Sequence, residues 1–94
     1  MALFVMICLD KPGSLELRMA TRPAHLAYAG TFASVVKLGG PILDDKGDMA
    51  GSMLIMEGET EEVARAFNRE DPYTLAGLFE SVQVLAFRPT IGTL

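Results

Sequence analysis

Residues 2–10 read "ALFVMICLD", eight apolar residues in succession followed by an aspartate. The β-branched and aromatic side chains favour an extended strand, which ends in the "DKPG" turn cluster at residues 10–13. A strand of an antiparallel sheet that is covered on one side normally alternates apolar and polar residues. This stretch does not alternate, and neither does "MLIM" at residues 53–56. We therefore expect both faces of the sheet to be buried.

A helix is expected after this strand. Ser14 is a candidate N-cap, and we expect one long helical segment from Ser14 to Lys37, ended by Gly39-Gly40. Pro23 has no amide proton to donate, so the segment should be kinked or broken near Thr21. The apolar residues that recur at helical spacing, and that we expect to face the core, are Leu26, Ala29, Ala33 and Val36.

The second half of the chain adds two strands, a helix and a last strand. The two strands flank the "DDKGD" turn at residues 44–48, and Thr60 precedes the helix. Asp71 as N-cap and Pro72 at the first helical position restart a helical turn, and residues 80–89 form the last strand. The buried residues predicted for this helix are Val63, Ala66 and Phe67.

The order strand, helix, strand, strand, helix, strand is typical of the α+β ferredoxin-like βαββαβ sandwich. In that fold two helices cover one face of an antiparallel sheet. The apolar strands indicate that the other face is also covered, while the chain has helices enough for one side only. The simplest solution is a second copy packed sheet against sheet. We therefore expect a homodimer or a larger homo-oligomer.

Composition limits the class of protein. A chain of 94 residues has room for a single domain, residues 1–94. Cys8 is the only cysteine, which excludes an intrachain disulfide and fits a reducing cytoplasm. The N-terminus has no basic leader, and no apolar run approaches the roughly 18 residues that a membrane span needs. The net charge of −4 argues against nucleic acid. We expect a cytoplasmic protein that acts on small molecules.

The only histidine lies in "RMATRPAHLAYAG", residues 18–30. On a continuous helix Arg18, Arg22 and His25 fall at i, i+4 and i+7, on one face. Arginine binds carboxylates with a planar fork, and histidine exchanges protons near neutral pH. This face therefore predicts a site that holds an anion and moves a proton.

A general base needs a carboxylate to fix its tautomer, and Asp71 is the best candidate. Asp10 and the aspartates of residues 44–48 are interpreted as turn residues. One histidine and one cysteine make no zinc site, and no cofactor motif is present, so we expect neither metal nor cofactor. Plainer interpretations stay open: His25 as a packing residue, Asp71 as a helix cap only, and Cys8 as an inert buried thiol.

Three stretches together resemble the YCII-related (YciI-like) proteins. The resemblance implies a ferredoxin-like fold that dimerises through its sheets, as in dimeric α+β barrels, and a site centred on a histidine and an aspartate. Matched by motif, these are His25 in "RPAHL" and Asp71 in "DPY"; Gly40-Pro41 and Gly51-Ser52 fall on the middle strands near a pocket mouth. The stretches are "DKPGSLELRMATRPAHLAYAG" (10–30), "LGGPILDDKGDMAGSMLIME" (38–57) and "DPYTLAGLFESVQVLAFRP" (71–89).

Relatives of similar fold include muconolactone isomerases and a dehydrochlorinase that acts on a chlorinated hydroxyquinol. The leading hypothesis is thus a cofactor-independent lyase or isomerase acting on a small anionic, cyclic or aromatic metabolite through a His25–Asp71 pair. The residues expected to bind the substrate are Arg18, Arg22, Ser52 and Tyr73. One alternative is a non-catalytic dimeric module that binds a small molecule or supports another enzyme. The other is a purely structural role for the motif residues.

Overall fold

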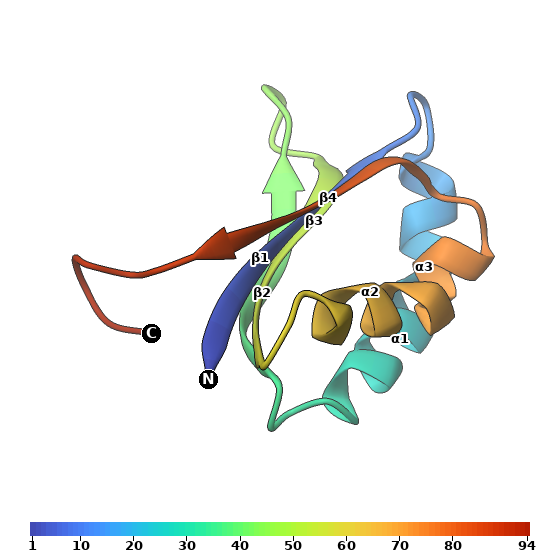
Figure 1. The fold of residues 1–94 in the computed structure, drawn as a ribbon. Helices are drawn as coiled ribbons and strands as arrows, with labels where there is room; N and C mark the ends of the chain where they lie inside the picture. The colour runs from blue at the N-terminus through green and yellow to red at the C-terminus, as the bar shows by residue number, and fades with distance from the viewer.

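A four-stranded antiparallel sheet with the strand order β2-β3-β1-β4 carries three helices on one face (Figure 1). The computed structural model describes residues 1–94, and the predicted ferredoxin-like βαββαβ arrangement is confirmed. None of the helices has the length and apolar character needed to cross a bilayer. The elements are β1 (Ala2–Asp10), α1 (Leu15–Gly30), β2 (Val36–Leu43), β3 (Met49–Gly58), α2 (Glu62–Glu70), α3 (Pro72–Leu75) and β4 (Phe79–Phe87).

The core lies between the sheet and α2. On the central strand β1, alternate side chains face the helices, and their partners on β3 do the same because paired residues share a face. Cys8 pairs with Ser52, so the helix-facing surface becomes polar toward the end of β1. The six fully packed core residues are Met6, Cys8, Leu54, Met56, Ala64 and Phe67.

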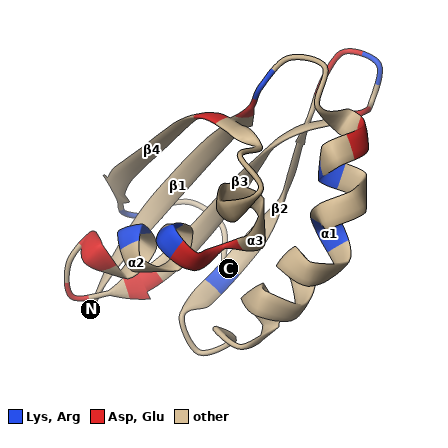
Figure 2. Ribbon diagram, turned by 90° about the vertical axis from the view of Figure 1, so that its right-hand side faces the viewer, with Lys and Arg blue, Asp and Glu red and all other residues tan.

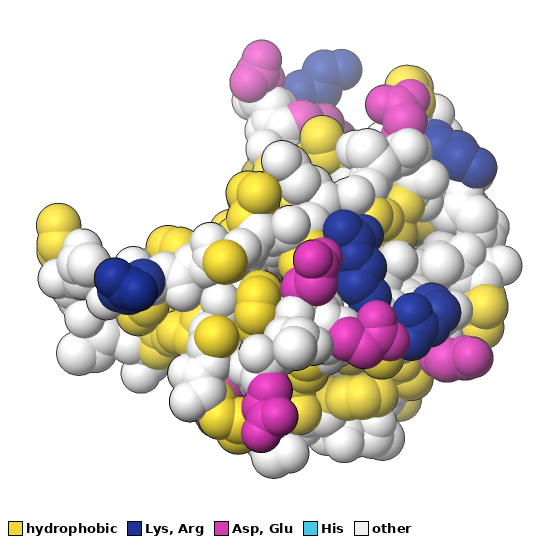
Figure 3. All heavy atoms as spheres, in the orientation of Figure 1, with side chains coloured by type: hydrophobic (Ala, Val, Ile, Leu, Met, Phe, Trp, Pro, Cys, Tyr) yellow, Lys and Arg dark blue, Asp and Glu magenta, His cyan; other side chains and the backbone are white.

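The opposite face of the sheet carries an apolar surface that no element of the chain covers. In Figure 3 hydrophobic side chains reach the surface on the left, toward β4, whereas charged side chains gather over α2. We call this surface the open face. By the pairing registers, its apolar residues are Leu3, Val5, Ile7, Leu9, Leu38, Ile42, Met53, Ile55, Leu85 and Phe87.

Helix α1 differs from its predicted extent. It runs through Pro23 without a break, so of the two expected alternatives, a kink or a break near Thr21, the break is wrong. It also ends at Gly30 and not at Lys37, because the carbonyl groups of its last turn accept hydrogen bonds from the turn that follows. Gly39-Gly40, expected to end the helix, lies instead within β2.

The shorter helix changes which residues are buried. Leu26 is 50% exposed, and Ala33 lies exposed in the turn after α1; only Ala29 of the expected stripe packs on the core from the helix. On α2 the fully buried alanine is Ala64, whereas the predicted Ala66 is exposed. The buried residues of α1 are the polar Arg18 and His25, because this side of the helix faces a cavity for part of its length.

The short helix α3 begins as the sequence predicts. Asp71 occupies the N-cap position, with Pro72 at the first helical position, and its side chain accepts a hydrogen bond from the backbone N–H of Tyr73 at 3.0 Å. A carboxylate that accepts an otherwise unpaired amide proton is the usual way to start a helix. This cap fixes the position of the Asp71 carboxylate above the sheet.

Candidate active site

A cavity of about 160 Å³ lies between α1, the edge strand β2, β3 and α3. One wall is apolar and the other polar, the combination typical of small-molecule sites. The apolar wall consists of Leu26, Ala29, Val36, Pro41 and Leu54, with Gly39 and Gly40 at the β2 side. The polar wall consists of Arg18, Arg22, His25, Ser52 and Tyr73.

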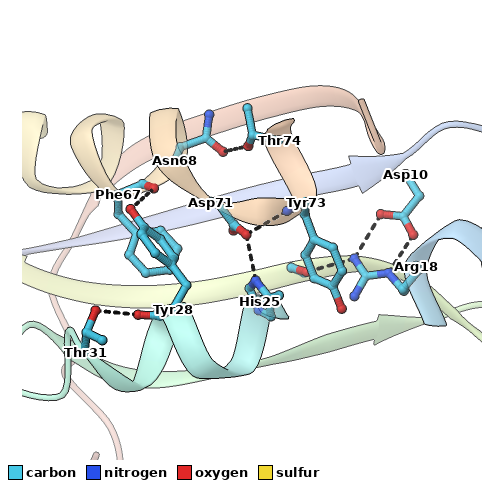
Figure 4. Close-up of polar contacts among 11 residues, drawn as sticks. Asp10, Arg18, His25, Tyr28, Thr31, Phe67, Asn68, Asp71, Tyr73 and Thr74 are labelled. Carbon is cyan, nitrogen blue, oxygen red and sulfur yellow. Dashed lines mark hydrogen bonds and ion pairs between the residues drawn. The ribbon is translucent and has the colours of Figure 1, made fainter. Parts of the chain in front are cut away.

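His25 and Asp71 are in direct contact. The Nδ1 atom of His25 lies 2.8 Å from Oδ1 of Asp71, and the two residues are only 8% and 1% exposed. A carboxylate can only accept, so Nδ1 carries a proton, and in the neutral imidazole Nε2 keeps a free lone pair. The pair joins α1 to the start of α3 across 46 residues of sequence (Figure 4).

Tyr73 lies against His25 in a ring stack. The ring centroids are 4.1 Å apart with an interplanar angle of 18°. The guanidinium carbon of Arg18 lies 4.5 Å from the centroid of the same tyrosine ring, so Figure 4 shows Tyr73 between a cation and an imidazole. Burial raises the pKa of the Tyr73 phenol above its usual range, against the charges of Arg18 and Arg22, which lower it.

Arg18 is held by a network that the sequence did not reveal. Its Nε and Nη2 atoms donate to the two carboxylate oxygens of Asp10 at 2.7 and 2.9 Å, and Nη2 also donates to the Ser52 hydroxyl at 2.8 Å. Burial alone would lower the pKa of Arg18, but the hydrogen bonds and charge of Asp10 outweigh it and raise that pKa. Asp10, interpreted as a turn residue, is thus the partner of a buried arginine.

Arg22 is the cation of the cavity that has no acidic partner. It is absent from all five ion pairs of the structure and lines the cavity one helical turn after Arg18. The charged residues of α1 all lie in its first half, and the rest of the helix is uncharged (Figure 2). Positive charge is therefore concentrated at one end of the cavity.

All six predicted site residues thus line or adjoin the same cavity. His25, Arg18, Arg22, Ser52 and Tyr73 line the cavity, and Asp71 lies behind His25. Sequence reasoning missed Asp10 and most of the apolar wall, of which only Pro41, with Gly40 beside it, was expected near the pocket. The signal for Asp10 was the alternation along β1, which turns its side chain to the helix side of the sheet.

Two further residue groups stand apart from the cavity. Tyr28 and Phe32, which extend the stripe of His25 in sequence, pack on Phe67 with ring centroids 5.0 Å apart and belong to the core. Burial, with the nearby charge of Asp71, raises the pKa of the Cys8 thiol to about 12. No cluster of three or more metal-binding side chains is formed.

The sequence matches the YCII-related domain over residues 2–88. It is 38% identical to protein YciI of Escherichia coli O6:H1 (strain CFT073), over 92% of this chain and 96% of that protein. It is 30% identical to an uncharacterized protein of Haemophilus influenzae, over 90% and 95% of the two chains.

Two solved structures are similar to this chain. The 5-chloro-2-hydroxyhydroquinone dehydrochlorinase of Burkholderia phenoliruptrix AC1100, solved in complex with 2,5-dihydroxybenzoquinone, is 40% identical with a TM-score of 0.83, covering 92% of this chain and 93% of its own. An antibiotic biosynthesis monooxygenase shares the fold alone, at 10% identity and a TM-score of 0.57, over 97% and 100% of the chains. The match over residues 2–88 and the 38% identity to protein YciI show that this chain belongs to the YCII-related family.

Proposed function

We propose that this protein is a cofactor-independent lyase or isomerase that removes a proton from a small, anionic, cyclic or aromatic metabolite. The observation that carries the proposal is the buried hydrogen bond from Nδ1 of His25 to Asp71 beside a cavity with a free arginine. Cys8 is a free thiol, which favours a reducing compartment such as the cytoplasm as its place of action.

His25 is the proposed general base. With its Nδ1 proton held by Asp71, the imidazole offers the Nε2 lone pair to a substrate proton. The imidazolium that forms is stabilised by the carboxylate of Asp71, which is 1% exposed and little screened by water. The stacked ring of Tyr73 limits the rotation of the imidazole, so the base is oriented before substrate binds.

Arg22 is the proposed anion-binding group. When the substrate proton moves to Nε2, its bonding electrons leave a negative charge on a conjugated ring oxygen, and a nearby guanidinium stabilises that charge. In a lyase the charge then expels a leaving group such as chloride; in an isomerase the proton returns to another carbon atom. Arg18 is already bonded to Asp10 and Ser52, so Arg22 is the better candidate to meet the anion.

The dehydrochlorinase relative supports the substrate class. Its structure holds 2,5-dihydroxybenzoquinone, a flat ring with oxygen substituents. The cavity of this chain offers such a ring an apolar wall for its faces and a cationic wall for its oxygens. We therefore propose oxygenated six-membered rings as the first substrates to try.

The proposal is tested by the turnover of 5-chloro-2-hydroxyhydroquinone by the wild type, His25→Ala and Arg22→Gln. Loss of the base should lower the rate by about 10²–10⁴-fold with the protein still folded. Loss of the free cation should weaken binding of the same compound by about tenfold or more. Arg65→Gln, which removes an exposed arginine of α2 outside the cavity, is the matched control.

The outcomes separate the proposal from its alternatives. Full turnover by His25→Ala would overturn the mechanism. Binding without turnover by the wild type would make the chain a binding module. If His25→Ala lowered only the melting temperature, the motif residues would be structural.

We further propose that two copies pack through the open face. Ten apolar side chains project from this face of the sheet, and four of them, Leu9, Leu38, Leu85 and Phe87, are 42–51% exposed, as is typical of an apolar interaction surface. Leu85→Glu places a charge on this face and should convert a dimer to a monomer in sedimentation experiments. Leu75→Glu, on α3 and more exposed, is the matched control and should leave the mass unchanged. A wild type that sediments as a monomer would contradict the proposal.

A further inference from the structure

We propose that the Tyr73 hydroxyl is a second polar anchor of the site and donates a hydrogen bond to an oxygen atom of the bound ring. This inference rests on the proposed function, because it assumes that the cavity receives an oxygenated ring. It gives Tyr73 a direct contact with substrate in addition to its packing against His25.

The ring of Tyr73 is held in place by contacts with three other side chains. His25 stacks on it at 4.1 Å, the Arg18 guanidinium lies at 4.5 Å, and Phe79 meets it in an edge contact at 5.8 Å between centroids. The backbone N–H of the same residue donates to Asp71. Side chain and backbone are thus both fixed, so the hydroxyl points in one direction.

No group of the protein accepts the proton of this hydroxyl, although Tyr73 is only 1% exposed. Its oxygen accepts from the neighbouring Arg18 guanidinium, and because a guanidinium can only donate, the hydroxyl proton remains free. Since Tyr73 lines the cavity, the hydroxyl reaches open space there. A hydroxyl on a fixed ring at a cavity wall is available to a ligand.

The other tyrosine behaves differently. The hydroxyl of Tyr28 donates to the backbone carbonyl of Phe67 at 2.8 Å, and Tyr28 does not line the cavity. The hydroxyl of Tyr28 is therefore part of the fold, whereas the proton of the Tyr73 hydroxyl is available in the cavity. A tyrosine-to-phenylalanine substitution can remove either hydroxyl separately.

The state of the phenol agrees with a donor role. Burial raises the pKa of Tyr73, so the hydroxyl keeps its proton at neutral pH. The charge of Arg18 against the ring polarises the O–H bond without removing the proton. A protonated phenol donates to an oxyanion, as a neutral donor does in an oxyanion hole.

The experiment compares the binding of 2,5-dihydroxybenzoquinone to the wild type, Tyr73→Phe and Tyr28→Phe, followed by the absorbance of the compound and by calorimetry. Tyr73→Phe keeps the ring that packs on His25 and removes only the hydroxyl. We expect its affinity to fall by about 10- to 100-fold, with the melting temperature and the His25 ¹⁵N resonances unchanged. Tyr28→Phe should keep full affinity and unfold at a lower temperature.

The results distinguish the two levels of proposal. If the wild type binds and Tyr73→Phe binds equally well, the donor role is overturned while the proposed function stands. If the wild type does not bind this compound, the ring-binding function fails and the donor role fails with it. If Tyr73→Phe loses affinity together with a shift of the His25 resonances, the hydroxyl acts only by positioning, and the direct contact is overturned.

Discussion

Asp10 and Arg18 form a two-point ion pair, 2.7 and 2.9 Å between nitrogen and oxygen, with side chains 5% and 2% exposed. Arg22, one turn further along α1, has no such partner. Two arginines on one helix face therefore have different surroundings. Arg18 helps to hold β1 and α1 together, and Arg22 is available to a ligand.

We therefore expect substitution of Arg18 and of Arg22 to lower the free energy of unfolding by unequal amounts. Arg18→Met leaves the Asp10 carboxylate buried without a cation and should lower the free energy of unfolding by about 3–5 kcal/mol. Arg22→Met should change it by less than about 0.5 kcal/mol, because no buried group loses a partner. Urea unfolding measures both. Adding Asp10→Asn to Arg18→Met should recover part of the loss, and equal losses for the two arginine variants would contradict the assignment.

Asp71→Asn should alter the tautomer of His25. An amide side chain can still accept from the Tyr73 N–H, but its NH₂ group can turn to donate to Nδ1, which moves the imidazole proton to Nε2. We expect turnover to fall at least about 100-fold, with a stability loss of about 1 kcal/mol. The chain has one histidine, so ¹⁵N NMR of the imidazole reports the tautomer without overlap. An unchanged ¹⁵N pattern with an unchanged rate would remove Asp71 from the mechanism.

Gly39 is predicted to set the size of the cavity. A Cβ atom at this position would lie 3.3 Å from Cγ of Leu54, which lines the apolar wall, so Gly39→Val should narrow the cavity and weaken binding of 2,5-dihydroxybenzoquinone by about tenfold or more. Gly30→Val, at the end of α1 and outside the cavity, is the matched control, since a Cβ atom there meets nothing within 4 Å. Equal affinities of the two variants would show that Gly39 does not limit the ligand.

Cys8 predicts a loss of stability at alkaline pH. Its pKa rises from 9.0 in the unfolded chain to about 12 in the fold, through burial and the charges of Asp71 and Asp10 against that of Arg18. Between these values the unfolded chain has released the proton and the folded chain keeps it. The free energy of unfolding should therefore fall as pH rises above 9.0, by about 1.4 kcal/mol per pH unit from this group.

The measurement is urea unfolding of the wild type and Cys8→Ala from about pH 8 to 11. Tyr28 and Tyr73 titrate in both proteins, so the difference isolates the thiol. The wild type should lose stability faster than the variant above pH 9.0, because the unfolded wild type alone gains a thiolate. A constant difference across this range would show that the buried thiol ionises as it does in the unfolded chain.

The sequence pattern was sufficient for the topology but not for the end of α1. Residues 2–9 and 53–56 do not alternate, which predicted that both faces of the sheet are buried; both faces are apolar, and burial of the open face stays a prediction. The helix was expected to reach Lys37 because apolar residues continue at helical spacing beyond Gly30. The backbone N–H of Val36 instead completes the turn by donating to Phe32, and pairing with β3 then outweighs the local pattern.

The sequence predicted the site residues whose type or local motif is unusual in this chain, and it missed those that look ordinary. A lone histidine and an aspartate before a proline stand out, and the structure brings His25 and Asp71 into contact, while their catalytic role stays a prediction. Asp10 looks like any aspartate in a turn. Leu26 was expected in the core because periodicity locates the inward face of a helix, and it does not show whether that face meets side chains or a cavity.

The contact between His25 and Asp71 joins residues 46 positions apart, which is nearly half of the 94-residue chain. We expect such a contact to close late in folding, because it depends on the sheet pairing and on the docking of α1 and α3. A partly folded form without this docking should not hold the imidazole against the carboxylate. The imidazole resonance of the single histidine should therefore report completed folding, and the proposed base becomes oriented only in the folded chain.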